Sequence, residues 1–342
     1  MAKELIAGII GAGRIGRLHA QHLTKRISGV RVKTVTDVIL EAAESCAREL
    51  GIPNAAQDHR RIMDDKEIDF VVICSSTDTH AQFMKEAAAA GKHIFCEKPI
   101  ALDLSEIDQA LAEVKKHKVK LQIGFNRRFD SNYKRIHELV QAGEVGEPHI
   151  LRITSRDPAP PPIEYIKVSG GIFLDMMIHD FDMARFLIGD EVEEVYVNGA
   201  VKVDEEIGKA GDVDTVVVSL LFKNGVIGTI DNSRKAVYGY DQRAEVFGSK
   251  GMVQSGNNTP NRVQVATEER VSEDLPLHFF VERYVDSYIE EMNQFVDALR
   301  TDRPVPVSGL DGKYPVAMGL AATRSYKEHR PVTLSEIDPS LG

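Results

Sequence analysis

Short apolar runs alternate with amphipathic segments over the first third of the chain. Runs such as 5–10 and 69–74 are almost wholly apolar, which is typical of parallel strands that are buried on both faces. Segments such as 41–50 and 82–90 carry apolar residues at helical spacing. Further strands are predicted at 30–36, 93–96 and 120–125, and a further helix at 105–116. This alternation predicts an α/β domain with a doubly wound parallel sheet, up to residue 123.

The pattern changes from residue 124 onwards. Longer strands with alternating apolar and polar residues are predicted at 149–155, 192–203, 213–222, 226–232 and 244–247, with a short one at 332–334. Helices are predicted at 132–142, 171–187, 280–300 and 311–328. Lys223-Asn224-Gly225 joins two of the strands as a hairpin turn, in which Asn-Gly would supply the positive φ angles. Residues 124–342 are therefore expected to form an α+β domain with a large open, mainly antiparallel sheet.

A glycine pattern follows the first strand. Gly11-x-Gly13-Arg14-Ile15-Gly16 lies between an apolar run and a helix-forming sequence. Gly11 would allow a tight turn, Gly13 the approach of a pyrophosphate, and Gly16 close packing of helix on strand. The helix N-terminus offers free N–H groups to the phosphates. Glycines also occur in ordinary turns, but this position between strand and helix predicts a dinucleotide-binding Rossmann domain at 1–123.

An acidic residue ends the second strand. Asp37 lies 21 positions after Gly16 (37 − 16), near the offset expected for an acid that bonds the adenosine ribose hydroxyls. A carboxylate there would repel the additional phosphate of NADP, so the sequence predicts NAD as the cofactor. A simple turn residue at the strand end is the alternative interpretation.

Polar residues also follow the strand at 69–74. Ser75, Ser76, Thr77 and His80 lie at the carboxyl end of that strand, where parallel sheets bind ligands. We therefore predict that they contact the cofactor. The hydroxyl groups could equally cap the next helix, and both interpretations are compatible.

Glu97-Lys98-Pro99 follows the strand at 93–96. A cation at this strand end could hold a substrate hydroxyl and stabilise developing negative charge beside the nicotinamide. Glu97 could orient the ammonium group, and Pro99 stiffens the turn. We assign Lys98 to catalysis, and both Glu97 and Lys98 to cofactor binding. A solvated surface lysine is the alternative.

A candidate general base lies in the helix predicted at 171–187. Asp175 and His179 are four residues apart, so on a continuous helix they share one face. Histidine titrates near neutrality, as a general base should. A structural histidine is the alternative. No metal is predicted, because the cluster lacks a second nearby histidine and hydride transfer to NAD does not require one.

Two loops could complete a substrate site. Asn126 and Arg127 follow the last strand of the first domain, and Asp157 begins a proline-rich loop. We predict that all three contact the substrate, although either loop could be a simple connection.

Composition narrows the possible partners. A net charge of −10 over 342 residues gives no reason to expect nucleic acid or an anionic membrane. The sequence has neither an 18-residue apolar run nor the apolar core of a signal peptide. Cys46, Cys74 and Cys96 lack metal-like spacing, which suggests free thiols in a reducing compartment. A cytoplasmic location is expected.

Three motifs together resemble the Gfo/Idh/MocA oxidoreductases. The glycine turn, Glu97-Lys98-Pro99, and Asp175 with His179 occur in this order, and the similarity covers essentially the whole chain. The resemblance implies an NAD-binding Rossmann domain and an open-faced sheet domain that often mediates tetramer formation. It also implies that His179 is the base, that Lys98 positions the substrate hydroxyl and influences the proton relay, and that Asp175 orients them.

Within this family the chain is most similar to the myo-inositol 2-dehydrogenases. The segments that carry this similarity are 124–129, 154–158, 170–182 and 238–241. It implies oxidation of a cyclic polyol, myo-inositol first, to the 2-keto product scyllo-inosose, with Tyr238 or Tyr240 reaching the polyol. Ser155 and Asp157 stand where some inositol dehydrogenases have histidine and asparagine, which bears on the isomer.

Two alternatives to this function remain. The first is another sugar or polyol dehydrogenase, acting on scyllo-inositol, glucose or an inositol derivative. The second is a non-catalytic NAD-sensing regulator, against which the presence of Lys98, Asp175 and His179 argues.

Overall fold

The computed structural model describes residues 4–341, which form two compact units. Unit 1 runs to Asn126 and also includes Asp286–Val316, whereas unit 2 holds Arg127–Val285 and continues from Ala317. The division expected from the sequence, 1–123 and 124–342, is contiguous and does not include this return of the chain. The chain returns to unit 1 because Met292 and Phe295 are fully buried in the core of that unit.

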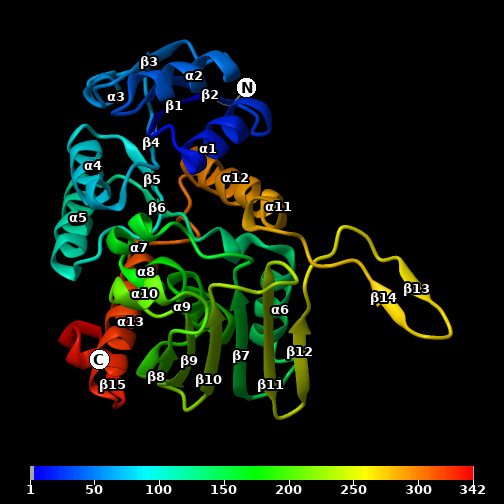
Figure 1. Cartoon of the computed structure of the whole chain (residues 1–342). Helices are drawn as coiled ribbons and strands as arrows, with labels where there is room; N and C mark the ends of the chain where they lie inside the picture. The colour runs from blue at the N-terminus through cyan, green and yellow to red at the C-terminus, as the bar shows by residue number, and fades with distance from the viewer. Residues whose placement is uncertain (1–3, 342) are drawn as a thin grey trace. The chain divides into compact units, whose positions relative to one another are not determined.

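Unit 1 contains a six-stranded parallel sheet in the order β3-β2-β1-β4-β5-β6 (Figure 1). This is the strand order of a Rossmann fold, as the alternation of strands and helices predicts. The strands are β1 (Leu5–Ile10), β2 (Val30–Thr36), β3 (Asn54–Ala56), β4 (Phe70–Ile73), β5 (His93–Cys96) and β6 (Leu121–Ile123).

The helices of unit 1 follow the strands in sequence. They are α1 (Arg14–Lys25), α2 (Leu40–Leu50), α3 (Arg60–Met63), α4 (Thr77–Ala89) and α5 (Leu104–His117), with α12 (Val285–Thr301) and the start of α13 (Gly309–Glu328) from the returning chain. Helix α4 begins five residues before its predicted start at residue 82 (82 − 77). Thr77 and His80 therefore belong to a helix rather than to a loop, and Ser76 is the N-cap residue.

Unit 2 contains a seven-stranded sheet in the order β12-β11-β7-β10-β9-β8-β15. Neighbours pair antiparallel except β7 with β10, so the sheet is mainly antiparallel, as predicted. The strands are β7 (Pro148–Arg156), β8 (Val192–Ala200), β9 (Thr215–Phe222), β10 (Ile227–Ser233), β11 (Asp241–Gly248), β12 (Gly251–Ser255) and β15 (Val332–Thr333). Along β9, buried and exposed residues alternate, so one face of the sheet is packed and the other is open.

The hairpin between β9 and β10 differs in detail from the prediction. The N–H of Gly225 donates to the Phe222 carbonyl at 2.9 Å, and Gly225 has a φ of +88°. Asn224 is not among the described residues with a positive φ. Its side-chain oxygen instead accepts from the N–H of Val226 at 3.1 Å. Only glycine is therefore required for its backbone here, and the asparagine contributes through its side chain.

The helix predicted at 171–187 is interrupted. It forms α8 (Gly171–Asp175) and α9 (Ile178–Ile188), and the N–H of Met177 reaches back five residues to the Ile172 carbonyl at 2.9 Å. Asp175 ends the first helix and His179 lies in the first turn of the second. The prediction of one continuous helix is therefore wrong. Because i,i+4 spacing places residues on one face only where the helix is unbroken, the spacing alone does not place Asp175 and His179 on a shared face.

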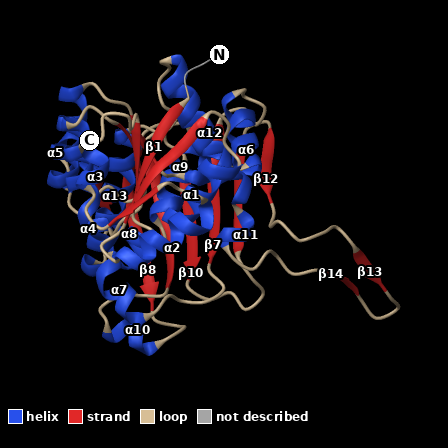
Figure 2. Ribbon diagram, turned by 90° about the horizontal axis from the view of Figure 1, so that it is seen from above, coloured by secondary structure: helices blue, strands red, loops and turns tan. Residues whose placement is uncertain are grey.

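The remaining helices of unit 2 are short apart from α6. They are α6 (Ser131–Gln141), α7 (Ile163–Ser169), α10 (Glu205–Lys209) and α11 (Phe280–Arg283). The hairpin of β13 (Gln264–Ala266) and β14 (Val271–Glu273) extends from long loops, away from the seven-stranded sheet (Figures 1 and 2). Over residues 4–341, no helix combines the length and apolarity that a membrane crossing requires.

Candidate cofactor and substrate sites

The glycine turn has the geometry that a bound pyrophosphate requires. Gly11 has a φ of +99°, and a Cβ there would lie 2.5 Å from the Cys74 carbonyl oxygen. A Cβ on Gly16 would overlap the carbonyl oxygen of Gly11, so helix α1 could not pack as closely on the turn. Gly13 is exposed, and a Cβ there would meet no atom within 4 Å. The turn is thus tight at Gly11 and Gly16 and open at Gly13.

The N-terminus of α1 fits an anionic ligand. Gly13 is its N-cap residue, no side chain caps the described helix, and its first turn holds no acidic residue. The first-turn N–H groups and the positive end of the helix dipole therefore suit a phosphate. Arg14 is exposed and Ile15 is half-buried beside them.

Asp37 is held against the glycine turn. Its Oδ2 accepts a hydrogen bond from the Ala12 N–H at 2.7 Å, and its Oδ1 accepts from the Ile39 N–H at 2.9 Å. These two bonds fix the carboxylate at the end of β2. A fixed carboxylate in this position fits the ribose of NAD.

The polar residues after β4 have distinct positions. Ser75 Oγ lies 2.7 Å from Thr79 Oγ1, whereas Ser76 is exposed at the start of α4. His80 is buried, with Nδ1 2.8 Å from the Pro99 carbonyl oxygen and Nε2 3.0 Å from that of Ser75. Burial lowers the pKa of His80, and a neutral ring can donate to only one carbonyl at a time. His80 therefore connects the strand ends that carry Ser75 and Lys98.

The Glu97-Lys98-Pro99 turn is partly buried. Glu97 is 8% exposed, and its Oε1 lies 2.7 Å from His19 Nε2. Lys98 is half-buried. The sequence predicted that Glu97 orients Lys98; the structure adds His19 as a partner of Glu97 from helix α1.

In unit 2, Asp175 is positioned by two side chains that the sequence analysis did not select. The Tyr165 hydroxyl donates to Asp175 Oδ1 at 2.9 Å, and Arg234 Nη1 lies 3.5 Å from Asp175 Oδ2. Arg234 is buried and also pairs with Asp212, which accepts from the Ile172 N–H at the start of α8. Arg234 thus fixes Asp175 and the helix that carries it.

His179 is half-buried in the first turn of α9, which a buried polar network holds in place. Asp180 accepts from Arg127 Nη1 at 2.6 Å and from Asn232 Nδ2 at 2.8 Å. Arg127 also donates to the Tyr240 hydroxyl at 3.2 Å. Arg127, predicted as a substrate contact, therefore forms a buried ion pair beside the candidate base.

Three further predicted substrate residues, Asn126, Tyr238 and Asp157, form no hydrogen bond with Asp180, Arg127 or Asn232 in the part of the chain that the structure describes. Asn126 is buried and donates to Ser287 Oγ at 3.2 Å. The Tyr238 hydroxyl donates to Asp241 Oδ2 at 2.6 Å and accepts from Arg156 at 3.0 Å. Asp157 is half-buried, and its backbone carbonyl and N–H bond to residues 236 and 233.

The carboxyl group of Asp157 has a pKa well above that of an ordinary aspartate. Loss of hydration raises the pKa of Asp157 to about 7, against the opposing charges of Arg127 and Arg234. Between pH 4 and 7 the folded protein keeps this proton while the unfolded chain releases it, so the contribution of Asp157 to stability falls as the pH rises. We expect the free energy of unfolding of Asp157→Asn, relative to that of the wild type, to rise between pH 4 and about 7. Above about pH 7 the difference between the two proteins should be constant. Urea denaturation across this range measures it; a difference that does not vary with pH would contradict the assignment.

Two stretches of the chain match known protein families. Residues 5–125 match the family described as "Oxidoreductase family, NAD-binding Rossmann fold", and residues 133–254 match the "GFO/IDH/MocA C-terminal domain". The chain belongs to the Gfo/Idh/MocA oxidoreductase family. The resemblance carried by its motifs is confirmed, and the protein is an oxidoreductase with an NAD-binding Rossmann domain.

Relatives within the family act on different inositols according to their names. "Myo-inositol 2-dehydrogenase" of Thermotoga maritima is 51% identical over 96% of this chain and 98% of its own. "scyllo-inositol 2-dehydrogenase (NAD(+))" of Bacillus subtilis is 36% identical over 98% and 97%. The crystal structure of scyllo-inositol dehydrogenase from Lactobacillus casei, with bound NAD(H) and scyllo-inositol, is 30% identical, with a TM-score of 0.91 over 97% of this chain and 100% of that one.

Proposed function

We propose that this family member oxidises a secondary hydroxyl of a cyclic polyol, myo-inositol foremost, to the ketone scyllo-inosose. The observation that carries the proposal is the 51% identity, over almost the full length of both chains, to the myo-inositol 2-dehydrogenase of Thermotoga maritima. NAD, when bound, supplies the hydride acceptor. The alcohol loses a hydride to NAD and a proton to the protein, so ketone, NADH and one proton result.

In this proposal the protein's own residues manage the hydroxyl and its proton. The Lys98 ammonium holds the reacting oxygen and balances the negative charge that develops on it. His179 accepts the hydroxyl proton as general base. Asp175, fixed by Tyr165 and Arg234, keeps these groups oriented, and Asp157, Asn126 and Tyr238 are proposed to contact the other hydroxyls.

A substrate panel tests the proposal. The protein is incubated with NAD and, in turn, myo-inositol, scyllo-inositol and glucose, and NADH is followed by its absorbance. We expect the highest kcat/KM for myo-inositol. Preference for scyllo-inositol or glucose would move the assignment to another polyol dehydrogenase, and no NADH from any of them would favour the non-catalytic regulator.

Charge at Asp37 is expected to set the choice of cofactor. Asp37→Asn keeps an acceptor for the Ala12 N–H but removes the negative charge that would repel the 2′-phosphate of NADP. We expect the ratio of kcat/KM for NAD to that for NADP to fall about tenfold, equivalent to about 1.4 kcal/mol. Steady-state kinetics with both cofactors measure the ratio, with Asp58→Asn as an exposed control. An unchanged ratio would remove Asp37 from the ribose site.

We propose a homotetramer formed through the open sheet of unit 2. Large apolar side chains are exposed on its strands, among them Val217, Leu221, Ile227, Phe247 and Met252. An exposed apolar patch of this kind is typical of an interface between subunits. Light scattering measures the mass, and Ile227→Lys should lower it; a monomeric wild type would contradict the proposal.

A further inference from the structure

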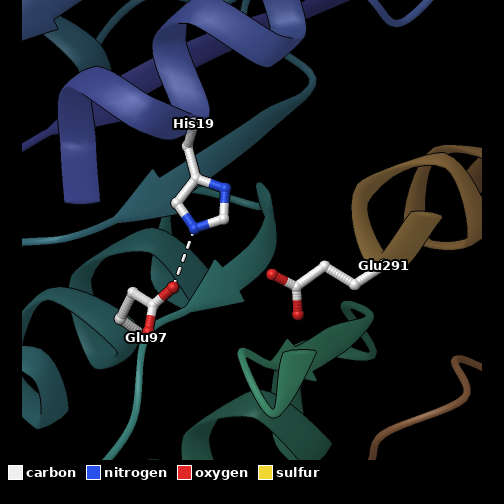
Figure 3. A group of neighbouring side chains, drawn as sticks. All are labelled: His19, Glu97 and Glu291. Carbon is white, nitrogen blue, oxygen red and sulfur yellow. Dashed lines mark hydrogen bonds and ion pairs between the residues drawn. The ribbon is translucent and has the colours of Figure 1, made fainter. Parts of the chain in front are cut away.

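Three buried polar side chains converge in unit 1, from parts of the chain that are distant in sequence. His19 comes from α1, Glu97 follows β5, and Glu291 comes from α12. One nitrogen or oxygen atom of each lies within 4.8 Å of the others, and all three residues are buried. Figure 3 shows the three side chains pointing toward one another.

His19 and Glu97 form a direct hydrogen bond. His19 Nε2 lies 2.7 Å from Glu97 Oε1, whereas its buried Nδ1 has no hydrogen-bond partner among the described residues. The ring proton therefore lies on Nε2, which donates to the carboxylate. Phe95 and Tyr288 pack edge-on against the ring, at centroid distances of 5.0 and 5.8 Å, and hold its orientation.

Glu291 is in a different situation from Glu97. It is fully buried, and within residues 4–341 neither of its carboxyl oxygens has a hydrogen-bond partner. An ionised carboxylate is very unfavourable in such a position unless it is paired. Burial, together with the like charge of Glu97, raises the pKa of Glu291 well above its usual range. A protonated Glu291 is also a hydrogen-bond donor, and its carboxyl group lies within 4.8 Å of the Glu97 carboxylate.

Within residues 4–341, no lysine or arginine forms a hydrogen bond with the Glu291 carboxyl group. From α1 it faces His19, and after β5 it faces Glu97. Burial raises the pKa of the Cys74 thiol, after β4, well above its usual range, and Glu97 and Glu291 are both close enough to contribute. Tyr288 lies one helical turn before Glu291 on α12 and packs on His19. The charged group that acts on Glu291 is Glu97, which favours its neutral form.

We propose that Glu291 carries a proton and that Glu291 and His19 together hold the Glu97 carboxylate in place. Through Glu97, Glu291 thereby positions the Glu97-Lys98-Pro99 turn. Glu291 is a positioning residue and acts through Glu97. The catalytic meaning of the position of Lys98 rests on the proposed function. The proton on Glu291 and its effect on the turn do not.

Two further contacts show how tightly this turn is held. A Cβ on Gly124 would lie 3.0 Å from the Glu97 carboxyl group, so β6 leaves the carboxylate little room on that side. The Pro99 carbonyl is fixed by His80. Because His19 lies in the second turn of α1, which begins at the glycine turn, its bond to Glu97 links the predicted pyrophosphate site with the turn that carries Lys98.

A divalent cation is the competing occupant, since one histidine and two carboxylates are common metal ligands. The geometry favours the proton. A metal bound through His19 Nε2 would have to replace the 2.7 Å contact between that nitrogen and Glu97. A proton on Glu291 neutralises this buried carboxyl group and leaves the bond between His19 and Glu97 intact.

The proton is tested by infrared spectroscopy of the full-length protein without cofactor. We expect the wild-type spectrum minus that of Glu291→Gln to contain the carbonyl band of a protonated carboxyl group at neutral pH. The wild-type spectrum minus that of Glu290→Gln should lack this band, and other protonated carboxyl groups such as Asp157 cancel in both differences. Glu290, the adjacent residue of α12, is half-buried and bonds Gln294, so it is a matched control. No such band, or an equimolar metal that elemental analysis finds in the wild type and not in Glu291→Gln, would overturn the proposal.

The positioning role is tested on Lys98 itself, without substrate or cofactor. The rate at which acetic anhydride acetylates Lys98 is followed by peptide mass spectrometry in Glu291→Met, Glu291→Gln and Glu290→Met. We expect at least a threefold change in Glu291→Met, which loses the donor, and less than a twofold change in the other two. Equal rates in all variants would overturn the proposal even if the wild type oxidises polyols.

Turnover gives a second measure of the positioning role. We expect Glu291→Met to lower kcat about tenfold with little change in KM for the polyol, and Glu291→Gln to restore at least a third of the wild-type value. A merely structural Glu291 predicts that the apolar methionine is as active as the wild type. Failure of the wild type to oxidise any polyol would refute the proposed function, while the infrared and acetylation results would still decide the inference.

Discussion

Replacing His179 with alanine is expected to lower kcat for polyol oxidation by about 10²–10⁴-fold, the usual contribution of a general base. Without the imidazole, the hydroxyl proton has no acceptor as the hydride leaves. The affinity for NAD should change less than about threefold (a difference below about 0.7 kcal/mol), because the glycine turn and Asp37 belong to unit 1 and His179 to unit 2. NADH absorbance measures turnover, and calorimetry measures NAD binding.

Two controls separate chemistry from structure at His179. His149 is an exposed histidine of β7 in the same unit, and His149→Ala should leave kcat unchanged. Added imidazole should partly restore turnover in His179→Ala, because it can occupy the space left by the ring and accept the proton. Wild-type turnover in His179→Ala would exclude His179 as the base. A large loss without rescue, accompanied by weaker folding, would indicate a structural histidine.

The second large effect is expected at Asp180. Its carboxylate is fully buried and bonds both Arg127 and Asn232. Burial raises the pKa of Asp180, and the charge of Arg127 opposes that shift. Asp180→Ala would leave the Arg127 guanidinium buried and unpaired, so we expect a loss of about 3–5 kcal/mol in the free energy of unfolding.

Urea denaturation of the full-length protein measures this loss. The double variant Arg127→Met with Asp180→Leu removes both charges, and we expect it to recover most of the stability, because an apolar pair is often as stable as a buried ion pair. Glu193→Ala removes an exposed carboxylate of β8 in the same unit and serves as the control. A loss below about 1 kcal/mol in Asp180→Ala would show that water or another group satisfies Arg127.

The parts of the fold that depend on local periodicity could be predicted from the sequence. The strand at 30–36 and the strand at 93–96 have the predicted bounds. The first alternates valine with charged residues over 30–33, and the second is a short apolar run, and both patterns are typical of strands. The break between α8 and α9 could not be predicted in this way. Residues 176–178 are apolar, and neither proline nor glycine lies at the break, so no local signal marks the interruption.

The candidate site was predicted where a motif marks it. The glycine turn and the Glu97-Lys98-Pro99 turn are local patterns, so the sequence could select them. Arg234 is 59 residues from Asp175 (234 − 175), and no motif connects the two. Asp180 lies within the selected stretch, but its role depends on Arg127 and Asn232, which only the fold brings to it.

The same limit applies to Glu291. Its helix, α12, has the amphipathic pattern of any surface helix, and the pattern does not indicate which of two sheets it covers. Three-dimensional contacts are needed to place it beside His19 and Glu97.

The return of residues 286–316 to unit 1 has a consequence for synthesis on the ribosome. The core around β1 and β2 includes Met292, Phe295 and Val296, which are translated after almost all of unit 2. Until they emerge, the nascent Rossmann sheet exposes the apolar surface that α12 later covers, and such surface promotes aggregation. Unit 2, by contrast, can form most of its sheet beforehand, since β7–β12 are contiguous in the chain. The nucleotide-binding half of this protein therefore begins first and is completed late, and a fragment that ends at residue 123 would lack part of its own core.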